Sequence, residues 1–192
     1  MFSATDTLRL NLGCGNHRLA GWVNIDCCKG ADVVVDLEEA CLPYEENTVD
    51  EMLLSHTLEH IENALGLMQE LWNIAAPGCV LTVKTPYGGS DDAWEDPTHV
   101  RPYFVKSFSY FGQPFYWRAD YGYLGDWLVK KIQLFVPPAV YDLPTDEAMR
   151  KVDSERNVVK EMVAHLVAVK PAREPRKELQ EQLNVRICRC VS

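Results

Sequence analysis

Four short apolar segments in the first half of the chain each end in glycines or in a side chain that can bind a ligand. Alternating apolar residues indicate strands, and helical spacing follows the fourth segment. Strands that alternate with helical stretches predict an α/β fold with a mostly parallel sheet. The segments are 8–12, followed by Gly13-Cys14-Gly15; 22–26, ending in Asp26; 32–36, ending in Asp36; and 49–55, followed by His56.

Later parts of the chain supply further elements of the same sheet. Apolar residues between 59 and 74 recur at helical spacing, and Pro77-Gly78 ends that helix. Only residues 16–21 separate the first two strands, so the crossover helix there is expected to be very short or replaced by a loop. We expect a Rossmann-like sheet of seven strands flanked by helices. The remaining predicted elements are strands at 79–85, 128–136 and 158–169 and a helix at 144–152.

Length and composition are those of one ordinary domain: 192 residues, 47% hydrophobic and 24% charged. We expect a single domain over residues 1–170 and a charged C-terminal tail over 171–192. An insertion over 88–127 follows strand five, and residues 103–127 carry 11 of the 19 aromatic residues. Such a segment is predicted to be a lid over a substrate site or an extra packing layer.

The charge pattern bears on partners. The formal net charge is −9, divided into −13 over residues 1–100 and +4 over 101–192. Non-specific binding of a strongly acidic chain to nucleic acid is weak, so a small molecule is the expected partner. No apolar run approaches the ~20 residues of a membrane span, and the first twelve residues lack a signal-peptide pattern. We therefore expect a cytoplasmic protein with no membrane partner.

The ends of the four strands are where a ligand is expected, because open parallel sheets bind ligands outside the carboxyl ends of their strands. Gly13 and Gly15 let the backbone approach a ligand closely with its amides exposed. Asp26 can accept two hydrogen bonds from a ribose diol. Asp36 can accept one from an exocyclic amine such as that of adenine. Together these groups predict an adenosine-shaped pocket.

The segment Leu10-Asn-Leu-Gly-Cys-Gly15 resembles the first motif of class I S-adenosylmethionine-dependent methyltransferases. The resemblance is specific in order and spacing over roughly residues 8–110, and beyond that only the general architecture is similar. His17 stands where the motif often has a third glycine, and Asn11 where it often has an acid. The other matching segments are 21–26, 32–37, 42–50, Ser55-His-Thr-Leu-Glu-His-Ile61, Pro77-Gly78 and Asp96-Pro-Thr-His-Val-Arg101.

The resemblance implies the cofactor and its contacts. S-adenosylmethionine would be held with Gly13 and Gly15 at its methionine and ribose portion, Asp26 at the ribose hydroxyls, and Asp36 with Leu37 at the adenine. Ser55 and His56 would lie near the transferred methyl group. The full candidate set for cofactor binding is Asn11, Gly13, Cys14, Gly15, Asp26, Asp36, Leu37, Ser55 and His56.

The implied reaction is an in-line methyl transfer to a hydroxyl or amine of a small molecule, such as a sugar or another metabolite. A general base helps only when the acceptor carries a proton to be removed. His99 is the first candidate, because it follows strand five on the same rim, and His56 is the second. The alternative is a non-catalytic module of the same fold that only binds the cofactor.

No metal site is predicted, although three patterns contain residues of metal-binding type. His56-Thr-Leu-Glu59-His60 fits the H-x-x-E-H signature of zinc peptidases, which requires both histidines on one helix. Acidic residues of the insertion offer hard oxygen ligands for a divalent cation, yet a solvated acidic loop is the simpler interpretation. Free thiols likewise explain the seven cysteines better than an irregular zinc site. The acidic residues are Asp91, Asp92, Glu95 and Asp96, and the cysteines of such a site are Cys14, Cys27, Cys28 and Cys41.

Overall fold

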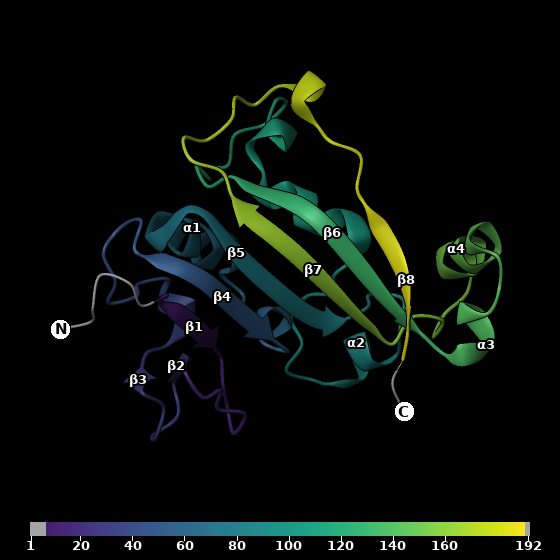
Figure 1. The fold of residues 1–192 in the computed structure, drawn as a ribbon, viewed down its shortest axis with the longest axis horizontal. Coiled ribbons are helices and arrows are strands. Elements are labelled where there is room, and N and C mark those ends of the chain that lie inside the picture. The colour runs from purple at the N-terminus through teal and green to yellow at the C-terminus, as the bar shows by residue number, and fades with distance from the viewer. Residues whose placement is uncertain (1–6, 191–192) are drawn as a thin grey trace.

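The computed structural model describes residues 7–190, which form one twisted sheet of eight strands in the order β3-β2-β1-β4-β5-β7-β6-β8 (Figure 1). Strands β1 to β5 are parallel to one another, whereas β7 runs antiparallel to both β5 and β6. The strands are β1 (Arg9–Leu12), β2 (Val23–Asp26), β3 (Val33–Val34), β4 (Val49–Ser55), β5 (Ala75–Pro86), β6 (Trp127–Val136), β7 (Glu161–Ala168) and β8 (Val185–Arg189).

The helices are few and mostly short. The longest are α1 and α4, and most of the others are single turns of 3-10 helix. None of the helices within residues 7–190 is long and apolar enough to cross a membrane. The helices are α1 (Ala64–Ile74), α2 (Asp92–Glu95), α3 (Pro138–Tyr141) and α4 (Thr145–Ser154), with 3-10 turns η1 (Leu37–Glu39), η2 (Leu58–His60), η3 (Val105–Phe111), η4 (Gln113–Phe115) and η5 (Lys177–Leu179).

The predicted α/β sheet is confirmed, with one strand more than expected. The seven predicted strands all occur, and the chain between β1 and β2 is a loop, as its length required. The eighth strand, Val185–Arg189, lies in the predicted tail and pairs in parallel with β6. Val185 and Ile187 of this strand are half-buried and pack against the core. The division at residue 170 stays a prediction.

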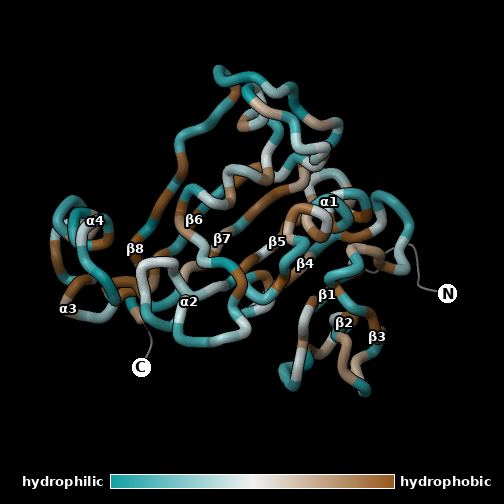
Figure 2. Tube along the Cα trace, turned by 180° about the vertical axis from the view of Figure 1, so that it is seen from behind, coloured by the Kyte–Doolittle hydropathy of each residue, from teal (hydrophilic) through white to brown (hydrophobic). Residues whose placement is uncertain are grey.

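Helix α1 and the chain between β5 and β6 lie on the same face of the sheet (Figure 2). Leu67, Met68 and Leu71 of α1 are fully buried there, together with Phe108 of η3. The indole Nε1 of Trp127 donates to the backbone oxygen of Met68 at 3.0 Å, which ties β6 to α1. Much of the aromatic-rich insertion is therefore a packing layer of the core.

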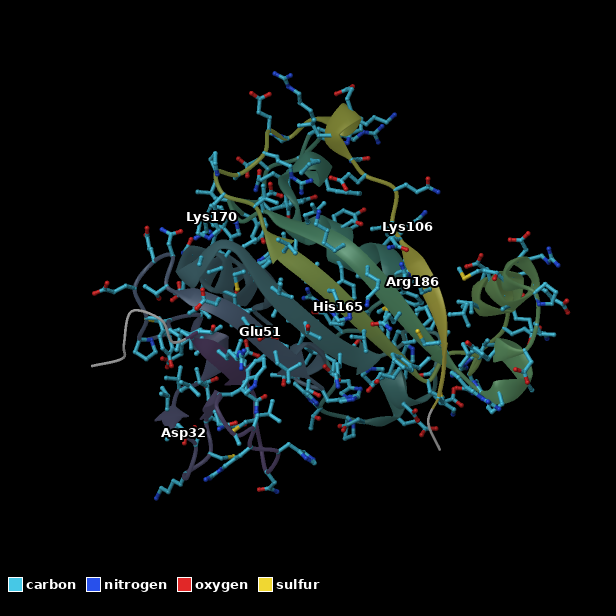
Figure 3. The ribbon with its side chains drawn as sticks, viewed as in Figure 1. Asp32, Glu51, Lys106, His165, Lys170 and Arg186 are labelled. Atoms are coloured by element: carbon cyan, nitrogen blue, oxygen red, sulfur yellow. The ribbon has the colours of Figure 1, made fainter. Side chains whose placement is uncertain are left out.

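The opposite face of the sheet carries a row of polar side chains. His165 of β7 lies in its middle (Figure 3). Its Nε2 lies 2.8 Å from Oε1 of Gln133 on β6, and its Nδ1 lies 3.3 Å from Oγ1 of Thr82 on β5. Among the described residues no helix covers this part of the sheet (Figure 1). Burial and the nearby lysines 131 and 84 lower the pKa of His165, so its neutral form is favoured.

Candidate functional site

A cavity of about 300 Å³ opens at the carboxyl ends of β1, β2 and β4. The sheet order reverses between β1 and β4, so the cavity lies at the position where doubly wound sheets bind ligands. Its volume is at the lower end of the range for small-molecule sites. The lining residues are Gly13, Asp26, Cys27, Asp36, Leu37, His56, Thr57, His60 and Ile61.

The turn after β1 requires glycine at its first position. Gly13 has φ of +69°, and a Cβ placed on it would lie 2.4 Å from Cγ2 of Thr57. Thr57 is held in place because its hydroxyl donates to the backbone oxygen of Leu12 at 3.1 Å. The Gly13 N–H donates to Ile25 O at 2.8 Å. This turn therefore joins β1, β2 and the chain after β4 at the wall of the cavity.

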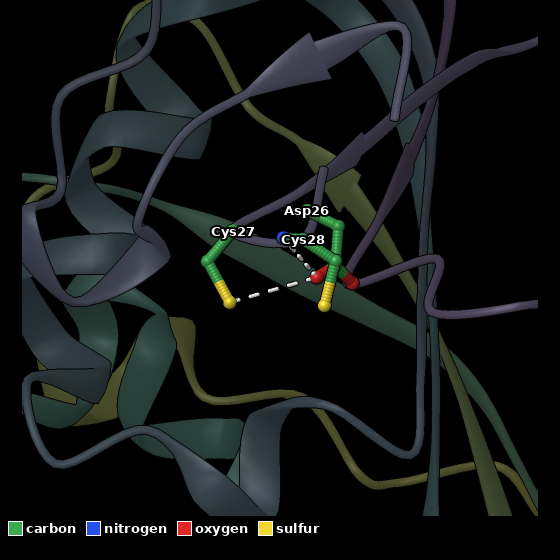
Figure 4. A group of neighbouring side chains, drawn as sticks. All are labelled: Asp26, Cys27 and Cys28. Atoms are coloured by element: carbon green, nitrogen blue, oxygen red, sulfur yellow. Dashed lines mark hydrogen bonds between the residues drawn. The ribbon is translucent and has the colours of Figure 1, made fainter. Parts of the chain in front are cut away.

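Asp26 ends β2 with its carboxylate at the cavity (Figure 4). Its Oδ2 accepts from the Gly15 N–H at 2.8 Å, and its Oδ1 accepts from the Cys28 N–H at 2.9 Å. Burial opposes its ionisation, but these hydrogen bonds outweigh burial and lower the pKa of Asp26. The carboxylate is therefore charged at neutral pH, and its Oδ2 keeps a lone pair for a ligand.

Two exposed cysteines follow Asp26 (Figure 4). The Cys27 thiol lies 3.6 Å from Oδ1 of Asp26, and the three side chains could together hold a metal ion. Hydrogen bonding to Asp26 raises the pKa of the Cys28 thiol to about 11, so this thiol is protonated at neutral pH. Cys14 is buried and Cys41 is exposed, and the structure does not bring the four cysteines of the considered zinc site together into a metal-binding group.

Asp36 and Leu37 form the far wall of the cavity. Asp36 caps η1, because its Oδ1 accepts from the Glu38 N–H at 3.0 Å. Leu37 is buried beneath it, and Ile61 lines the same cavity. An acid beside two aliphatic side chains can accept hydrogen bonds at the edge of a flat ring and pack against its face.

Five of the nine predicted cofactor residues line the cavity: Gly13, Asp26, Asp36, Leu37 and His56. Asn11 is turned away, because its Nδ2 donates to His17 O and to Oδ1 of Asn24, both at 2.9 Å. The remaining three, Cys14, Gly15 and Ser55, are not part of the lining. Four residues that the sequence reasoning did not assign to cofactor binding, Cys27, Thr57, His60 and Ile61, do line the cavity, and all lie next to a predicted residue or motif.

His56 lies between two carboxylates. Its Nε2 is 3.0 Å from Oε2 of Glu161, and its Nδ1 is 3.4 Å from Oε1 of Glu59. Hydrogen bonding to Glu161, and then the neighbouring Glu59 carboxylate, raise the pKa of His56 to about 9. At neutral pH this side chain is a cation, which can donate a proton or stabilise negative charge but cannot accept a proton.

A second cavity, of about 540 Å³, adjoins the first and shares His56 and His60 with it. His99 lies in its wall, with Nε2 at 3.9 Å from Oδ2 of Asp96. Asp91 is absent from its lining, because its carboxylate pairs with Arg156 and Asn157. The lining residues are His56, His60, Pro86, Asp92, Glu95, Asp96, His99, Lys160 and Glu161.

The structure does not support the zinc-peptidase interpretation. His56 follows the end of β4 with φ of +52°, and Glu59 and His60 belong to the 3-10 turn η2. The signature needs both histidines on one face of a continuous helix. Here His56 lies outside η2, and its ring contacts Glu161 of β7.

Comparison with solved structures identifies the fold. A methyltransferase from Archaeoglobus fulgidus that depends on S-adenosylmethionine (SAM) superposes with a TM-score of 0.60 at 14% identity, over 85% of this chain and 86% of that one. A chain from the Haloferax volcanii complex of the Trm112 methyltransferase activator with a methyltransferase superposes with a TM-score of 0.57 at 14% identity. The match covers 88% of this chain and 85% of that one. The cyclase SpnF superposes with a TM-score of 0.51 at 13% identity, over 88% of this chain and 76% of that one.

No family model and no curated protein matches the sequence. The solved structures are similar over most of both chains, and the mostly parallel sheet agrees with the sheet that the sequence motifs predicted. The chain therefore has the class I fold of S-adenosylmethionine-dependent methyltransferases.

Proposed function

We propose that this protein is a SAM-dependent methyltransferase that acts on a hydroxyl or amine of a small polar molecule. One observation carries the proposal. An ionised carboxylate, Asp26, lies at the sheet's switch point in a cavity whose other end holds Asp36 and Leu37. This arrangement offers hydrogen-bond acceptors for a ribose diol and for an adenine amine in one site.

The chain's own residues bind and orient the two reactants, while SAM supplies a methyl group activated on its sulfonium. Asp26 would hold the ribose, and Asp36 with Leu37 would hold the adenine. His56 lies where the two cavities meet and carries a positive charge held by Glu161. We therefore assign His56 an orienting role. His99 stays the candidate base, in the second cavity.

The second cavity is the proposed acceptor site because it shares a wall with the first. Four carboxylates line it against two cations, which are Lys160 and His56; the carboxylates are those of Asp92, Glu95, Asp96 and Glu161. Such a lining repels a polyanion and favours a neutral or cationic polar acceptor. This charge pattern, together with the net charge of −9, supports a metabolite over a nucleic acid.

Calorimetry with S-adenosylhomocysteine (SAH) tests the cofactor assignment. Asp26→Ala removes the charged acceptor of two ribose hydrogen bonds, so we expect the binding free energy to weaken by about 2–4 kcal/mol, or ~30- to 1,000-fold in Kd. Glu46→Ala, an exposed acid in the turn before β4, is the matched control and should bind like wild type. Equal binding by Asp26→Ala and wild type would contradict the assignment.

A second measurement separates an enzyme from a binding module. The SpnF cyclase has the same fold, so the fold alone does not specify methyl transfer. Methyl transfer from labelled SAM to a panel of small hydroxyl and amine acceptors is expected. SAH binding without transfer to any acceptor would favour the non-catalytic alternative.

A further inference from the structure

Three side chains where the two cavities meet form a group that neither the cofactor nor the fold explains. The ligand atoms of Glu59, His60 and His99 all lie within 4.8 Å of one another. The two imidazole rings meet edge to face, with centroids 4.7 Å apart. We propose that Glu59, His60 and His99 bind one divalent transition-metal ion of the Zn²⁺ class.

Buried polar atoms without partners supply the first argument. Glu59 is 2% exposed, and within the described part of the chain neither of its carboxylate oxygens accepts a hydrogen bond. The Nδ1 atom of His99 is likewise buried without a partner among residues 7–190. Buried carboxylates are normally paired or coordinate a metal. The charged His56 ring forms an ion pair with Oε1 of Glu59 at 3.4 Å, without hydrogen-bond geometry, and Oε2 of Glu59 has no partner among residues 7–190.

The surroundings of His60 supply the second argument. Its Nδ1 lies 2.9 Å from Oγ1 of Thr98 and 3.2 Å from the backbone oxygen of Thr98. The Thr98 hydroxyl donates its proton to Oδ1 of Asp96 at 2.6 Å, so it can only accept from His60. Nδ1 therefore carries the proton, and Nε2 keeps its lone pair for a metal. A histidine that binds a metal usually donates its other ring N–H to a carboxylate, a backbone carbonyl or a water.

The donor set selects the ion. Two imidazoles and one carboxylate form the His₂Glu set of catalytic zinc sites, and related sets bind other first-row divalent metals. Mg²⁺ and Ca²⁺ prefer oxygen ligands, so they are expected to bind more weakly. Three protein ligands leave coordination positions open to a substrate.

The location suggests a role, which rests on the proposed function. His60 lines both cavities, and His99 lines the one assigned to the acceptor. A metal held there faces the acceptor beside the methyl donor. It would position an acceptor hydroxyl and lower the pKa of that hydroxyl, whose proton would pass to solvent water as the oxygen attacks the methyl group. His99 would then be a metal ligand, and the metal would replace it in the role of the base.

Titration of Zn²⁺ into the metal-free full-length protein tests the site. The titration is made in a Cys27→Ser/Cys28→Ser background, because within residues 7–190 those thiols and Asp26 form the other group able to hold a metal. We expect one Zn²⁺ per chain and a rise in Tm on binding. Glu59→Gln and His99→Ala should each weaken binding at least ~10-fold. His17→Ala, an exposed histidine elsewhere, should bind like the background protein.

The outcomes separate this proposal from the proposed function. Zn²⁺ is titrated without cofactor, and SAH is titrated into metal-free wild type, so either site can fail alone. Loss of Zn²⁺ binding in the cysteine background would place the metal at Asp26 and overturn the proposal, as would unchanged binding by Glu59→Gln and His99→Ala. If those variants do not fold, Co²⁺ absorption of the background protein decides. Co²⁺ absorption bands typical of nitrogen and oxygen ligands would support the site, and the absence of such bands would refute it.

Discussion

Asp126, the residue before β6, has a fully buried carboxylate that is paired with the guanidinium of Arg173. Its Oδ2 accepts from the backbone N–H and Nε of Arg173 at 2.8 and 2.9 Å. Its Oδ1 accepts from Nη2 of Arg173 at 2.8 Å and from the Gln113 N–H at 3.1 Å. The pair therefore fastens the aromatic-rich insertion and the chain after β7 to the edge of the sheet.

Arg173→Met keeps much of the apolar stem and removes the charge. It leaves the Asp126 carboxylate buried with two backbone hydrogen bonds and no counter-charge. Breaking a buried ion pair from one side costs about 3–5 kcal/mol of unfolding free energy. At roughly 2–4 °C per kcal/mol for a chain of this size, Tm should fall by about 6–20 °C.

Urea unfolding followed by circular dichroism measures this change. Lys151→Met, which breaks the exposed Lys151–Glu155 pair, is the control and should leave the midpoint where it is. Asp126→Asn combined with Arg173→Met should cost less than the sum of the single variants, because the stranded charge is gone. A loss below ~1 kcal/mol for Arg173→Met, or strict additivity, would refute the reasoning.

Two further predictions concern the turn after β1 and the polar face of the sheet. Gly13→Ala places a Cβ against Thr57 in a residue with positive φ. We expect weaker SAH binding by calorimetry, and a fall of about 1–3 kcal/mol in the free energy of unfolding by urea titration. Wild-type values in both measurements would show that the turn tolerates a side chain. His165 has a lowered pKa when folded, so the unfolded chain takes up its proton first and stability falls as pH drops below about 6.5. Between pH 7.5 and pH 5.5, the urea midpoint of unfolding should fall less for His165→Gln than for wild type. An equal fall in the two proteins would contradict this account.

The sheet was predictable because its signals are local. Strand β4 has the predicted bounds, Val49–Ser55, since apolar residues there are followed by a polar strand end. The helix after it was correctly expected to end before Pro77, although it begins only at Ala64. The missing crossover helix followed from the length of the loop after β1. In each case neighbours in sequence determine the outcome.

The parts that escaped prediction depend on contacts between distant residues. Strand β8 exists because β6 presents an open edge to residues 185–189. Asn11 has the position of a cofactor residue, yet Asn24 and the loop carbonyl of His17 hold its side chain elsewhere. The charge on His56 comes from Glu161, which is 105 residues away. No local pattern contains such information.

The central claim is that the cavity between β1, β2 and β4 binds SAM, and a crystal structure with SAH tests it most directly. The account predicts the ribose hydroxyls within hydrogen-bond distance of the Asp26 carboxylate and the adenine between Asp36 and Leu37. It also predicts that the sulfur faces His56 at the opening to the second cavity. SAH bound elsewhere, or bound in this cavity with no contact to Asp26, would contradict it.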